Sequence, residues 1–246
     1  MKPVAVNDLR VKIFADGADK KGMLEMHANP FIKGFTTNPT LMRKAGISNY
    51  EAFARDILAS IQDRPISFEV FSDDFAEMHD QALQIASWGK NVYVKIPVTN
   101  TLGQSAVPLV AKLAKAGVKQ NVTAIMTLDQ VRAVTDALAG GPAACVSVFA
   151  GRIADTGRDP LPIMTESVKI LSAHTQLELI WASPRELLNI FQAHDIGCHI
   201  ITVTNDIIKK LYLVGKNLEE FSLETVKMFY EDAVNAGFTL DSTVSA

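Results

Sequence analysis

Short β-rich runs alternate with longer helical stretches along the chain, and this alternation constrains the fold more than any other feature. Eight runs are rich in β-branched and aromatic residues, namely 11–17, 33–38, 65–71, 91–99, 118–126, 144–151, 177–183 and 198–204. Segments with helical periodicity lie between and after them, at 18–28, 49–62, 74–88, 104–116, 128–139, 162–174, 185–194, 205–214 and 222–236. No linker or shift in composition divides the 246 residues. We therefore predict an α/β fold, a (β/α)8 TIM barrel forming a single domain over residues 1–246, with an extra C-terminal helix.

Helix-start signals precede several of the helical stretches. The segments "SDDFAEM", "TLDQV" and "SPREL" each place a Ser, Thr or Asp before a helical run, as N-caps require. Ser183 is thus predicted to cap a helix that starts near residue 185. The amphipathic stretch at 222–236 is expected either to pack on a neighbouring subunit of a homo-oligomer or to close the side of its own barrel.

Charge and composition argue against several classes of partner. The chain has 24 Lys+Arg against 27 Asp+Glu, a net charge of -3, and no long charged run, so we expect neither nucleic-acid nor membrane binding. The N-terminus lacks a signal-peptide pattern, and no apolar run approaches the ~18 residues of a membrane span. Cys145 and Cys198 lie in apolar segments and read as buried thiols rather than a disulfide framework. These features predict a cytoplasmic protein.

The barrel interpretation predicts where functional groups should lie, because in this fold they gather at the C-terminal ends of the strands. Polar residues occur at seven of the eight expected strand ends: Asp16; Thr36, Thr37 and Asn38; Glu69; Lys95 and Thr99; Asn121 and Thr123; Ser147 and Arg152; Ser183 and Arg185. They are expected to converge on one mouth of the barrel.

Lys95 is the most unusual of these residues, since it interrupts the apolar run "NVYVKIPVTN". An ammonium group in such a strand is costly unless it reaches water, finds a partner or gives up its charge. As a neutral amine it would attack a ketone or aldehyde carbonyl and form a Schiff base. Alternation alone leaves equally open a surface lysine whose terminal nitrogen reaches water.

Schiff-base chemistry also needs groups that move protons. Glu69 and Thr123 are suitable for bringing water in and out of the carbinolamine, and Asp16 is a candidate base for the substrate hydroxyl. A purely structural ion pair between Glu69 and Lys95 remains open, as does a turn or capping role for Asp16.

Arg152 and Arg185 follow neighbouring expected strands and could grip a phosphate, helped by Ser183 and the helix N-terminus that it is expected to cap. The alternative is that both arginines are solvated loop residues. The five histidines show no ligand-like spacing, so we expect no metal and no other cofactor, which disfavours a metal-dependent aldolase.

Taken in order, six motifs resemble the transaldolases and their short relatives, the fructose-6-phosphate aldolase-like proteins. The similarity covers nearly the whole chain and is carried by "GFTTNPTLM", "ISFEVF", "VYVKIPVT", "NVTAIM", "VSVFAGRIADTG" and "WASPREL". The resemblance implies that Lys95 forms a Schiff base with a ketose donor and that Asp16 handles the proton of the hydroxyl at the cleaved bond. It implies that Glu69 and Thr123 relay protons through a water.

The resemblance also implies a set of substrate-binding residues. Asn38, Asn121 and Ser147 would hydrogen-bond the sugar hydroxyls, and Arg152, Ser183 and Arg185 would bind the phosphate. Thr36, beside Asn38 in the same motif, and Phe149 complete the expected substrate-binding set.

Two positions bear on the reaction within this family. Fructose-6-phosphate aldolases carry Gln and Tyr where this chain has Glu69 and Phe149, and transaldolases carry Glu and Phe. The chain therefore resembles a transaldolase that transfers a dihydroxyacetone unit between a ketose phosphate and an aldose phosphate. Three alternatives stay open: an aldolase that releases dihydroxyacetone, a transaldolase for a sulfonated or unusual sugar, and a non-catalytic sugar-phosphate-binding barrel. The substrate alternative arises because the loop after the sixth run, Pro184 and the tail beyond residue 215 depart from the family pattern.

Overall fold

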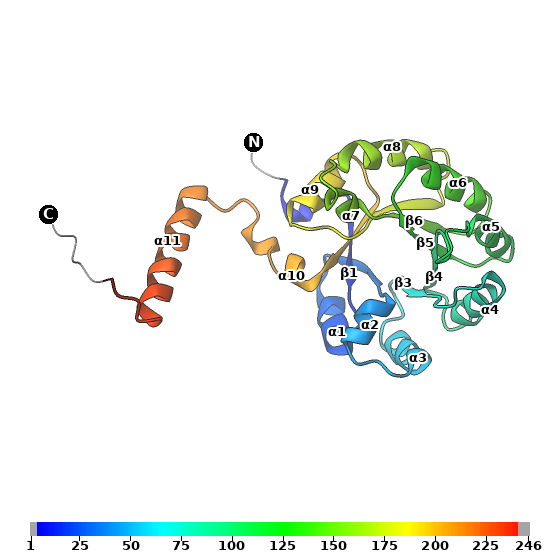
Figure 1. Cartoon of the computed structure of the whole chain (residues 1–246), viewed down its shortest axis with the longest axis horizontal. Helices are drawn as coiled ribbons and strands as arrows, with labels where there is room; N and C mark the ends of the chain where they lie inside the picture. The colour runs from blue at the N-terminus through cyan, green and yellow to red at the C-terminus, as the bar shows by residue number, and fades with distance from the viewer. Residues whose placement is uncertain (1–3, 241–246) are drawn as a thin grey trace.

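Parallel strands in chain order close into a barrel in the computed structural model, which describes residues 4–240 (Figure 1). The first strand pairs with both the second and the last, which closes the sheet. The strands are β1 (Lys12–Asp16), β2 (Ile32–Thr36), β3 (Ile66–Glu69), β4 (Val92–Pro97), β5 (Gln120–Ile125), β6 (Ala144–Val148), β7 (Leu177–Trp181) and β8 (Ile200–Thr204). The predicted (β/α)8 barrel is confirmed, and the observed strands differ from the predicted runs only at their ends.

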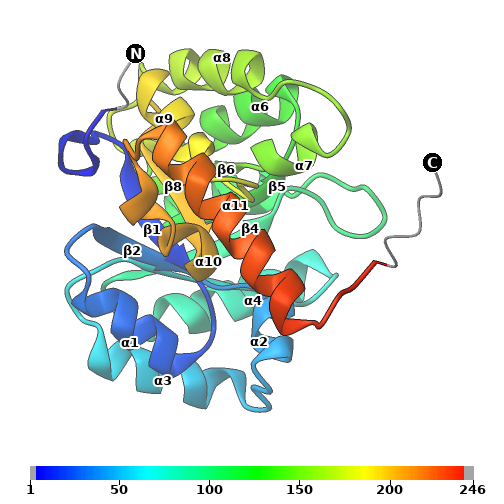
Figure 2. The ribbon, with the colours of Figure 1, turned by 90° about the vertical axis from the view of Figure 1, so that its left-hand side faces the viewer.

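Helices surround the barrel between successive strands (Figures 1 and 2). They are α1 (Lys20–Ala28), α3 (Tyr50–Ser60), α4 (Phe75–Ala86), α5 (Val107–Lys115), α6 (Leu128–Leu138), α8 (Leu161–Leu171) and α9 (Leu188–Asp195). The expected caps at two of them are confirmed: Asp74 accepts the first backbone N–H groups of α4, and Thr127 forms a capping box with Gln130 in α6. The stretch predicted at 205–214 is shorter, because α10 (Asn205–Ile208) gives way to a 3-10 turn at Leu211–Leu213.

Two short helices lie where the sequence predicts no helix. These are α2 (Pro39–Lys44) after β2 and α7 (Ala150–Ala154) after β6. The Asn38 side chain accepts the Leu41 N–H at 2.9 Å, and Pro39 occupies the first helical position, where its missing N–H is harmless. Both helices are too short for a periodic pattern to show in the sequence, but they shape the loops that surround the site.

The core combines strand residues with the apolar faces of the surrounding helices, so the strands are buried on both faces of the sheet, as in other parallel barrels. Val94 and Ile96 on β4 are fully buried among apolar residues. Lys95, between them in sequence, has its side chain on the opposite face and points into the mouth of the barrel. The alternating residues of this strand therefore face in two directions: one set packs in the apolar layer, and the other points into the barrel interior.

The extra C-terminal helix is confirmed as α11 (Leu218–Asn235), but it does not close the side of its own barrel. It stands apart from the strands and the other helices in Figure 1, and none of its residues is buried. The alternative that it packs on its own barrel is therefore wrong, because the turn at Leu211–Leu213 leads the chain away. Across residues 4–240, no helix is both long and apolar enough to span a membrane.

Gly34 on β2 offers a test of packing inside the barrel. A Cβ built at this position would lie 2.5–2.7 Å from three atoms of the buried Phe14 ring on β1. We expect Gly34→Ala to lower the free energy of unfolding by about 1–3 kcal/mol, because the ring must move in a filled interior. Urea unfolding measures this loss, with Gly17→Ala as control, where a Cβ meets no atom within 4 Å and no loss is expected.

Candidate active site

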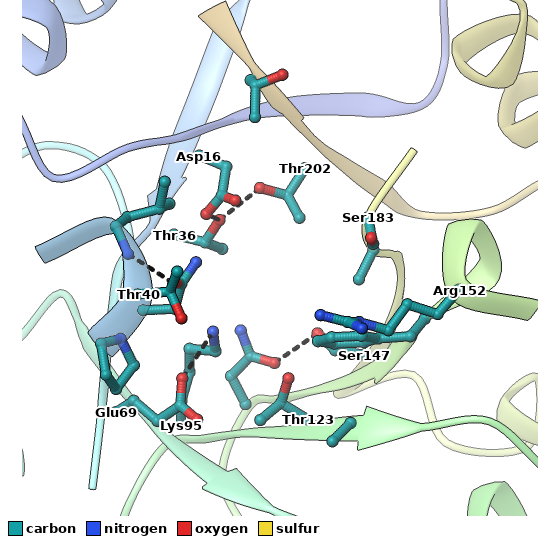
Figure 3. A pocket seen from close by; sticks show the side chains of 18 of the residues that line it. Asp16, Thr36, Thr40, Glu69, Lys95, Thr123, Ser147, Arg152, Ser183 and Thr202 are labelled. Atoms are coloured by element: carbon teal, nitrogen blue, oxygen red, sulfur yellow. Dashed lines mark hydrogen bonds and ion pairs between the residues drawn. The ribbon is translucent and has the colours of Figure 1, made fainter. Parts of the chain in front are cut away.

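A cavity of about 580 Å³ opens at the C-terminal ends of the strands (Figure 3). The candidate catalytic and substrate-binding residues of the sequence analysis all line it: Asp16, Thr36, Asn38, Glu69, Lys95, Asn121, Thr123, Ser147, Phe149, Arg152, Ser183 and Arg185. Thr37 and Thr99, which were also expected at the mouth, are not among the lining residues. Strand β8, for which the sequence suggested no polar group, contributes Thr202 and Thr204. The barrel thus brings together side chains that lie up to 188 residues apart in sequence, from Asp16 to Thr204.

Lys95 is held at the base of this cavity by two oxygen atoms. Its Nζ lies 3.1 Å from Glu69 Oε2 and donates a hydrogen bond of 2.9 Å to the Thr37 carbonyl. The pairing of β3 with β4 sets Glu69 directly beside Lys95. Because only 7% of Lys95 is exposed, the alternative of a surface lysine that reaches bulk water is wrong.

Asp16 at the end of β1 is a second carboxyl group in the cavity. Thr36 Oγ1 donates to Asp16 Oδ1 at 2.7 Å, and the hydroxyls of Thr36 and Thr202 are also hydrogen-bonded. Burial raises the pKa of Asp16 above its ordinary value, although the charge of Lys95 and the Thr36 hydrogen bond both oppose this rise. An aspartate in this state holds its proton more firmly than an exposed one.

A chain of buried polar side chains crosses the floor of the site. The Asn121 amide donates to Ser67 Oγ at 3.0 Å, and the Ser147 hydroxyl donates to Asn121 Oδ1 at 2.7 Å. These bonds fix the orientation of the Asn121 amide. Thr123 differs from them, because its buried Oγ1 has no hydrogen-bond partner among the described residues. A buried hydroxyl on the cavity wall is therefore available to bind a substrate atom or a water molecule.

Backbone strain is concentrated at the same cavity. Among residues 4–240, the non-glycine residues with positive φ are Ala124 at 63° and Ser183 at 59°, and both line the cavity. Ala124 follows Thr123, where the pairing between β5 and β6 shifts register. Such irregularities re-aim neighbouring side chains and are tolerated where the surrounding structure compels them.

Ser183 does not cap a helix, contrary to the prediction. Helix α9 begins only at Leu188, without a side-chain cap, and Ser183 lies in the loop after β7 with a left-handed backbone. Its carbonyl oxygen approaches Gly151 so closely that a Cβ on Gly151 would lie 1.5 Å away. This approach between the loops after β6 and β7 fixes the Ser183 conformation, and no local pattern could have predicted it.

The two arginines that the sequence analysis expects to bind a phosphate both line the cavity. Figure 3 shows the Arg152 side chain reaching into the cavity beside Ser147, across from Glu69. Arg185 is engaged by Asp155: its Nε donates to Asp155 Oδ1 at 2.8 Å, and a second contact joins the other guanidinium nitrogen to Oδ2. The guanidinium lowers the pKa of the exposed Asp155 carboxyl, so this residue is ionised at neutral pH.

Several lining residues had escaped the sequence analysis. Thr40 and Lys44 reach the cavity because α2 places them there, and Thr202 does so from β8. The alternation of "IITVT", in which threonines occupy every second position, is the signal that could have found Thr202. Among residues 4–240, no three His, Cys, Asp or Glu side chains are arranged to hold a metal ion.

A family model described as "Transaldolase/Fructose-6-phosphate aldolase" matches residues 13–245. The chain belongs to this family. Curated relatives named "Probable transaldolase" include one from Dehalococcoides mccartyi, 36% identical over 202 residues, which cover 82% of this chain and 90% of the relative. Another, from Thermoanaerobacter sp., is 36% identical over 231 residues, 94% of this chain and 100% of the relative. The resemblance found in the motifs is thus confirmed.

Solved structures with low sequence identity share the fold of this transaldolase-family chain. A dihydrodipicolinate synthase from Rhodopseudomonas palustris superposes with a TM-score of 0.56 at 13% identity, over 96% of this chain and 83% of that one. A putative phosphonomutase from Burkholderia cenocepacia gives a TM-score of 0.55 at 10% identity, over 90% and 94% of the two chains. At such identities the likeness concerns the barrel alone.

The raised pKa of Asp16 predicts a pH-dependent cost in stability. The pKa in the folded state lies above the ordinary value of 3.8, so ionisation destabilises the native state as the pH rises from that value through the folded pKa. We expect Asp16→Asn to unfold at higher temperature than the wild type at pH 7, with the difference shrinking towards pH 3.5. Thermal unfolding over this pH range measures it.

The matched control is Asp80→Asn, which neutralises a carboxylate whose side chain is 84% exposed. It is expected to change the unfolding free energy by less than about 0.5 kcal/mol. An Asp16→Asn protein that is less stable than the wild type at pH 7 would contradict the burial argument.

Proposed function

We propose that this protein is a Schiff-base transaldolase. It transfers a dihydroxyacetone unit from a ketose phosphate, such as fructose 6-phosphate or sedoheptulose 7-phosphate, to an aldose phosphate acceptor. The observation that carries the proposal is the buried Lys95, which shares one cavity with the carboxyl groups of Glu69 and Asp16. Membership of the transaldolase/fructose-6-phosphate aldolase family supports it.

In the first stage, Lys95 forms the covalent intermediate. Its ammonium group first passes a proton to Glu69, 3.1 Å away, and the neutral Nζ then attacks the C2 carbonyl of the ketose while Glu69 returns that proton to the carbonyl oxygen. Glu69 next takes up a proton from the attached nitrogen. The carbinolamine that results loses its hydroxyl as water when Glu69 returns a proton to that oxygen. The unpartnered hydroxyl of Thr123 is suited to hold this water near Lys95.

In the second stage, Asp16 opens the carbon–carbon bond. Its carboxylate removes the proton of the C4 hydroxyl, the C3–C4 bond breaks, and the aldose leaves with a new carbonyl at its former C4. The bonding electron pair moves to C3 and is delocalised as an enamine on Lys95. The raised pKa of Asp16 makes it a stronger base than an exposed carboxylate. An acceptor aldehyde then reacts at C3, Asp16 returns the proton, and water releases the new ketose.

The remaining lining residues divide between the hydroxyls and the phosphate. Asn121 and Ser147 are oriented by their mutual hydrogen bond, and Asn38 uses its oxygen as a helix cap, which leaves its amide N–H groups to donate to the sugar. Arg152 supplies positive charge at the side opposite Glu69 (Figure 3), and Arg185 supplies another positive charge in the cavity lining. The ion pair with Asp155 occupies the Nε edge of the Arg185 guanidinium and fixes its orientation, so a phosphate would contact the remaining edge.

Glu69 and Phe149 favour transfer over simple cleavage. In the family, these residue types accompany transaldolases, and both side chains line the cavity, where they control how readily water reaches the Schiff base. The alternative reactions are an aldolase that releases dihydroxyacetone, and transfer from a sulfonated or unusual sugar whose anionic end contacts Arg152 and Arg185. A non-catalytic binding barrel is disfavoured, because Lys95, Glu69, Asp16 and Thr123 are all present in the cavity.

The expected location is the cytoplasm, and the expected setting is the pentose phosphate pathway. Cys145 and Cys198 are both buried free thiols, which is compatible with a reducing compartment.

The Schiff base gives the most direct test of the proposal. Incubation with fructose 6-phosphate followed by borohydride reduction is expected to leave an adduct of dihydroxyacetone size on Lys95, which peptide mass spectrometry identifies. Lys95→Met should abolish both the adduct and turnover, because no other amine can replace Nζ at that position.

Product analysis with and without an acceptor aldehyde separates the alternatives. Transfer predicts that dihydroxyacetone release is slow without an acceptor and that a new ketose forms with one. Rapid release without an acceptor would identify an aldolase. If neither sugar phosphates nor their sulfonated analogues give an adduct on Lys95, the proposed chemistry is wrong.

We also propose that the protein assembles as a homo-oligomer through α11. This helix exposes large apolar side chains around much of its surface: Leu218, Phe221, Leu223, Val226, Met228, Phe229, Tyr230 and Val234. A helix of 18 residues without tertiary packing gains little stability of its own in water. Burial against a second copy of the chain would cover these side chains.

Light scattering after size-exclusion chromatography tests the assembly. The wild type is expected to have a mass that is a multiple of the 26.8 kDa chain. Phe229→Asp should lower this mass, because it places a charge among the exposed apolar residues, whereas Glu231→Gln alters only a polar position of α11 and should not. A wild-type mass of 26.8 kDa at every concentration would contradict the proposal.

A further inference from the structure

The Tyr50 hydroxyl occupies a place in the barrel where a strand would ordinarily lie. Tyr50 is the first residue of α3, and its hydroxyl oxygen accepts a hydrogen bond from the Glu69 N–H at 2.7 Å. The same hydroxyl donates to the Glu69 carbonyl at 2.8 Å. One side chain thus satisfies both backbone groups of the residue that carries the carboxylate beside Lys95.

The pattern of the β2–β3 ladder explains why these groups need a partner. The Phe35 N–H donates to the Pro65 carbonyl, and the Thr37 N–H donates to the Ser67 carbonyl. One further step of this parallel pattern would join the Glu69 N–H to the Thr37 carbonyl and the Glu69 carbonyl to the N–H of residue 39. Residue 39 is a proline, which has no N–H, and the chain turns there into α2. The ladder therefore stops one step short of Glu69.

The interrupted ladder leaves the Thr37 carbonyl to a different donor. It accepts the hydrogen bond from Lys95 Nζ at 2.9 Å, instead of the Glu69 N–H. Tyr50 therefore acts in two ways: it replaces β2 as the partner of Glu69, and it leaves the Thr37 oxygen for the lysine. Both members of the Lys95–Glu69 pair are placed by this exchange of partners.

We propose that Tyr50 is a positioning residue for the reaction, which acts through Glu69 by holding its backbone where β2 cannot. This inference rests on the proposed function, because the role it gives to Tyr50 is to keep the Glu69 carboxylate within reach of Lys95 Nζ. It concerns a residue outside the cavity lining, 19 positions before Glu69 in the sequence.

The tyrosine ring is itself held by aromatic neighbours. Its centroid lies 5.5 Å from that of Phe71, 5.9 Å from that of Trp88 and 6.3 Å from that of Phe68. Burial raises the pKa of the Tyr50 hydroxyl far above its ordinary value, so it remains a donor throughout the pH range in which a protein of this kind is assayed. Because the aromatic contacts involve the ring and not the hydroxyl, loss of the oxygen alone should leave the ring in place.

Tyr50→Phe removes both hydrogen bonds to Glu69 and keeps the aromatic packing. We expect kcat to fall about 10- to 100-fold, a part of the contribution that general acid–base catalysis makes, while KM for the sugar phosphate changes less than about threefold. The pH profile of kcat should also change, since the environment of Glu69 changes. Hydrogen exchange measured by mass spectrometry or NMR should show faster exchange at the Glu69 amide.

Two comparisons separate positioning from a general structural effect. Phe71→Leu disturbs the aromatic cluster but leaves the Tyr50 oxygen, so it should lower the melting temperature with kcat and the pH profile unchanged. In a Glu69→Gln background, Tyr50→Phe should cause little further loss of kcat, because the group through which it acts is already altered.

The inference is overturned if Tyr50→Phe lowers only the melting temperature and keeps the wild-type kcat and pH profile. It is also overturned if its effect on kcat simply multiplies with that of Glu69→Gln. Borohydride trapping on the wild type keeps this outcome distinct from a failure of the proposed function: without an adduct on Lys95 the proposed function fails, and with one the behaviour of Tyr50→Phe decides the inference.

Discussion

Two opposite charges, removed from water and set side by side on neighbouring strands, organise this barrel. Burial of an ion costs several kcal/mol unless a partner and further hydrogen bonds compensate it. Lys95 and Glu69 meet this condition because β3 and β4 pair in a register that places them together, and because the Thr37 carbonyl accepts a further hydrogen bond from Lys95 Nζ. The short β3, the end of β2 and the start of α3 are all arranged around this pair. The chemistry of the site therefore depends on strand register before it depends on any loop.

The opposite side of the cavity is built on a different principle. The side chains of Arg185 and Asp155 are 46% and 52% exposed, whereas those of Lys95 and Glu69 are 8% and 15% exposed. The reacting groups thus lie on rigid strands, whereas the groups proposed to bind the anionic end of the substrate lie on the short helix α7 and in the loop after β7. Loops change more readily than strands in sequence and conformation. The proposed choice of substrate can therefore vary while the reacting centre stays the same.

Much of this architecture can be predicted from the sequence, because the alternation of apolar and polar residues indicates which side chains are buried. The eight strands, the helices between them and the convergence of polar residues on one mouth all follow from periodicity and from the geometry of a barrel. Ser183 was misjudged because the Gly151 contact that sets its backbone comes from another loop. Tyr50 was missed for a similar reason: it lies at the start of a helix, and only the folded chain brings it to Glu69. Helices α2 and α7 are too short to produce a periodic signal.

Because of helix α11, the stability of this fold is expected to depend on protein concentration. Its apolar side chains are not covered by the barrel from which it extends. Any association that covers them adds a free-energy contribution that grows with the amount of protein present. Melting temperatures measured at low and at high protein concentration would then differ, because the fraction of chains in the assembled form differs between them. The sequence of a single chain would in that case encode a stability that one molecule alone does not possess.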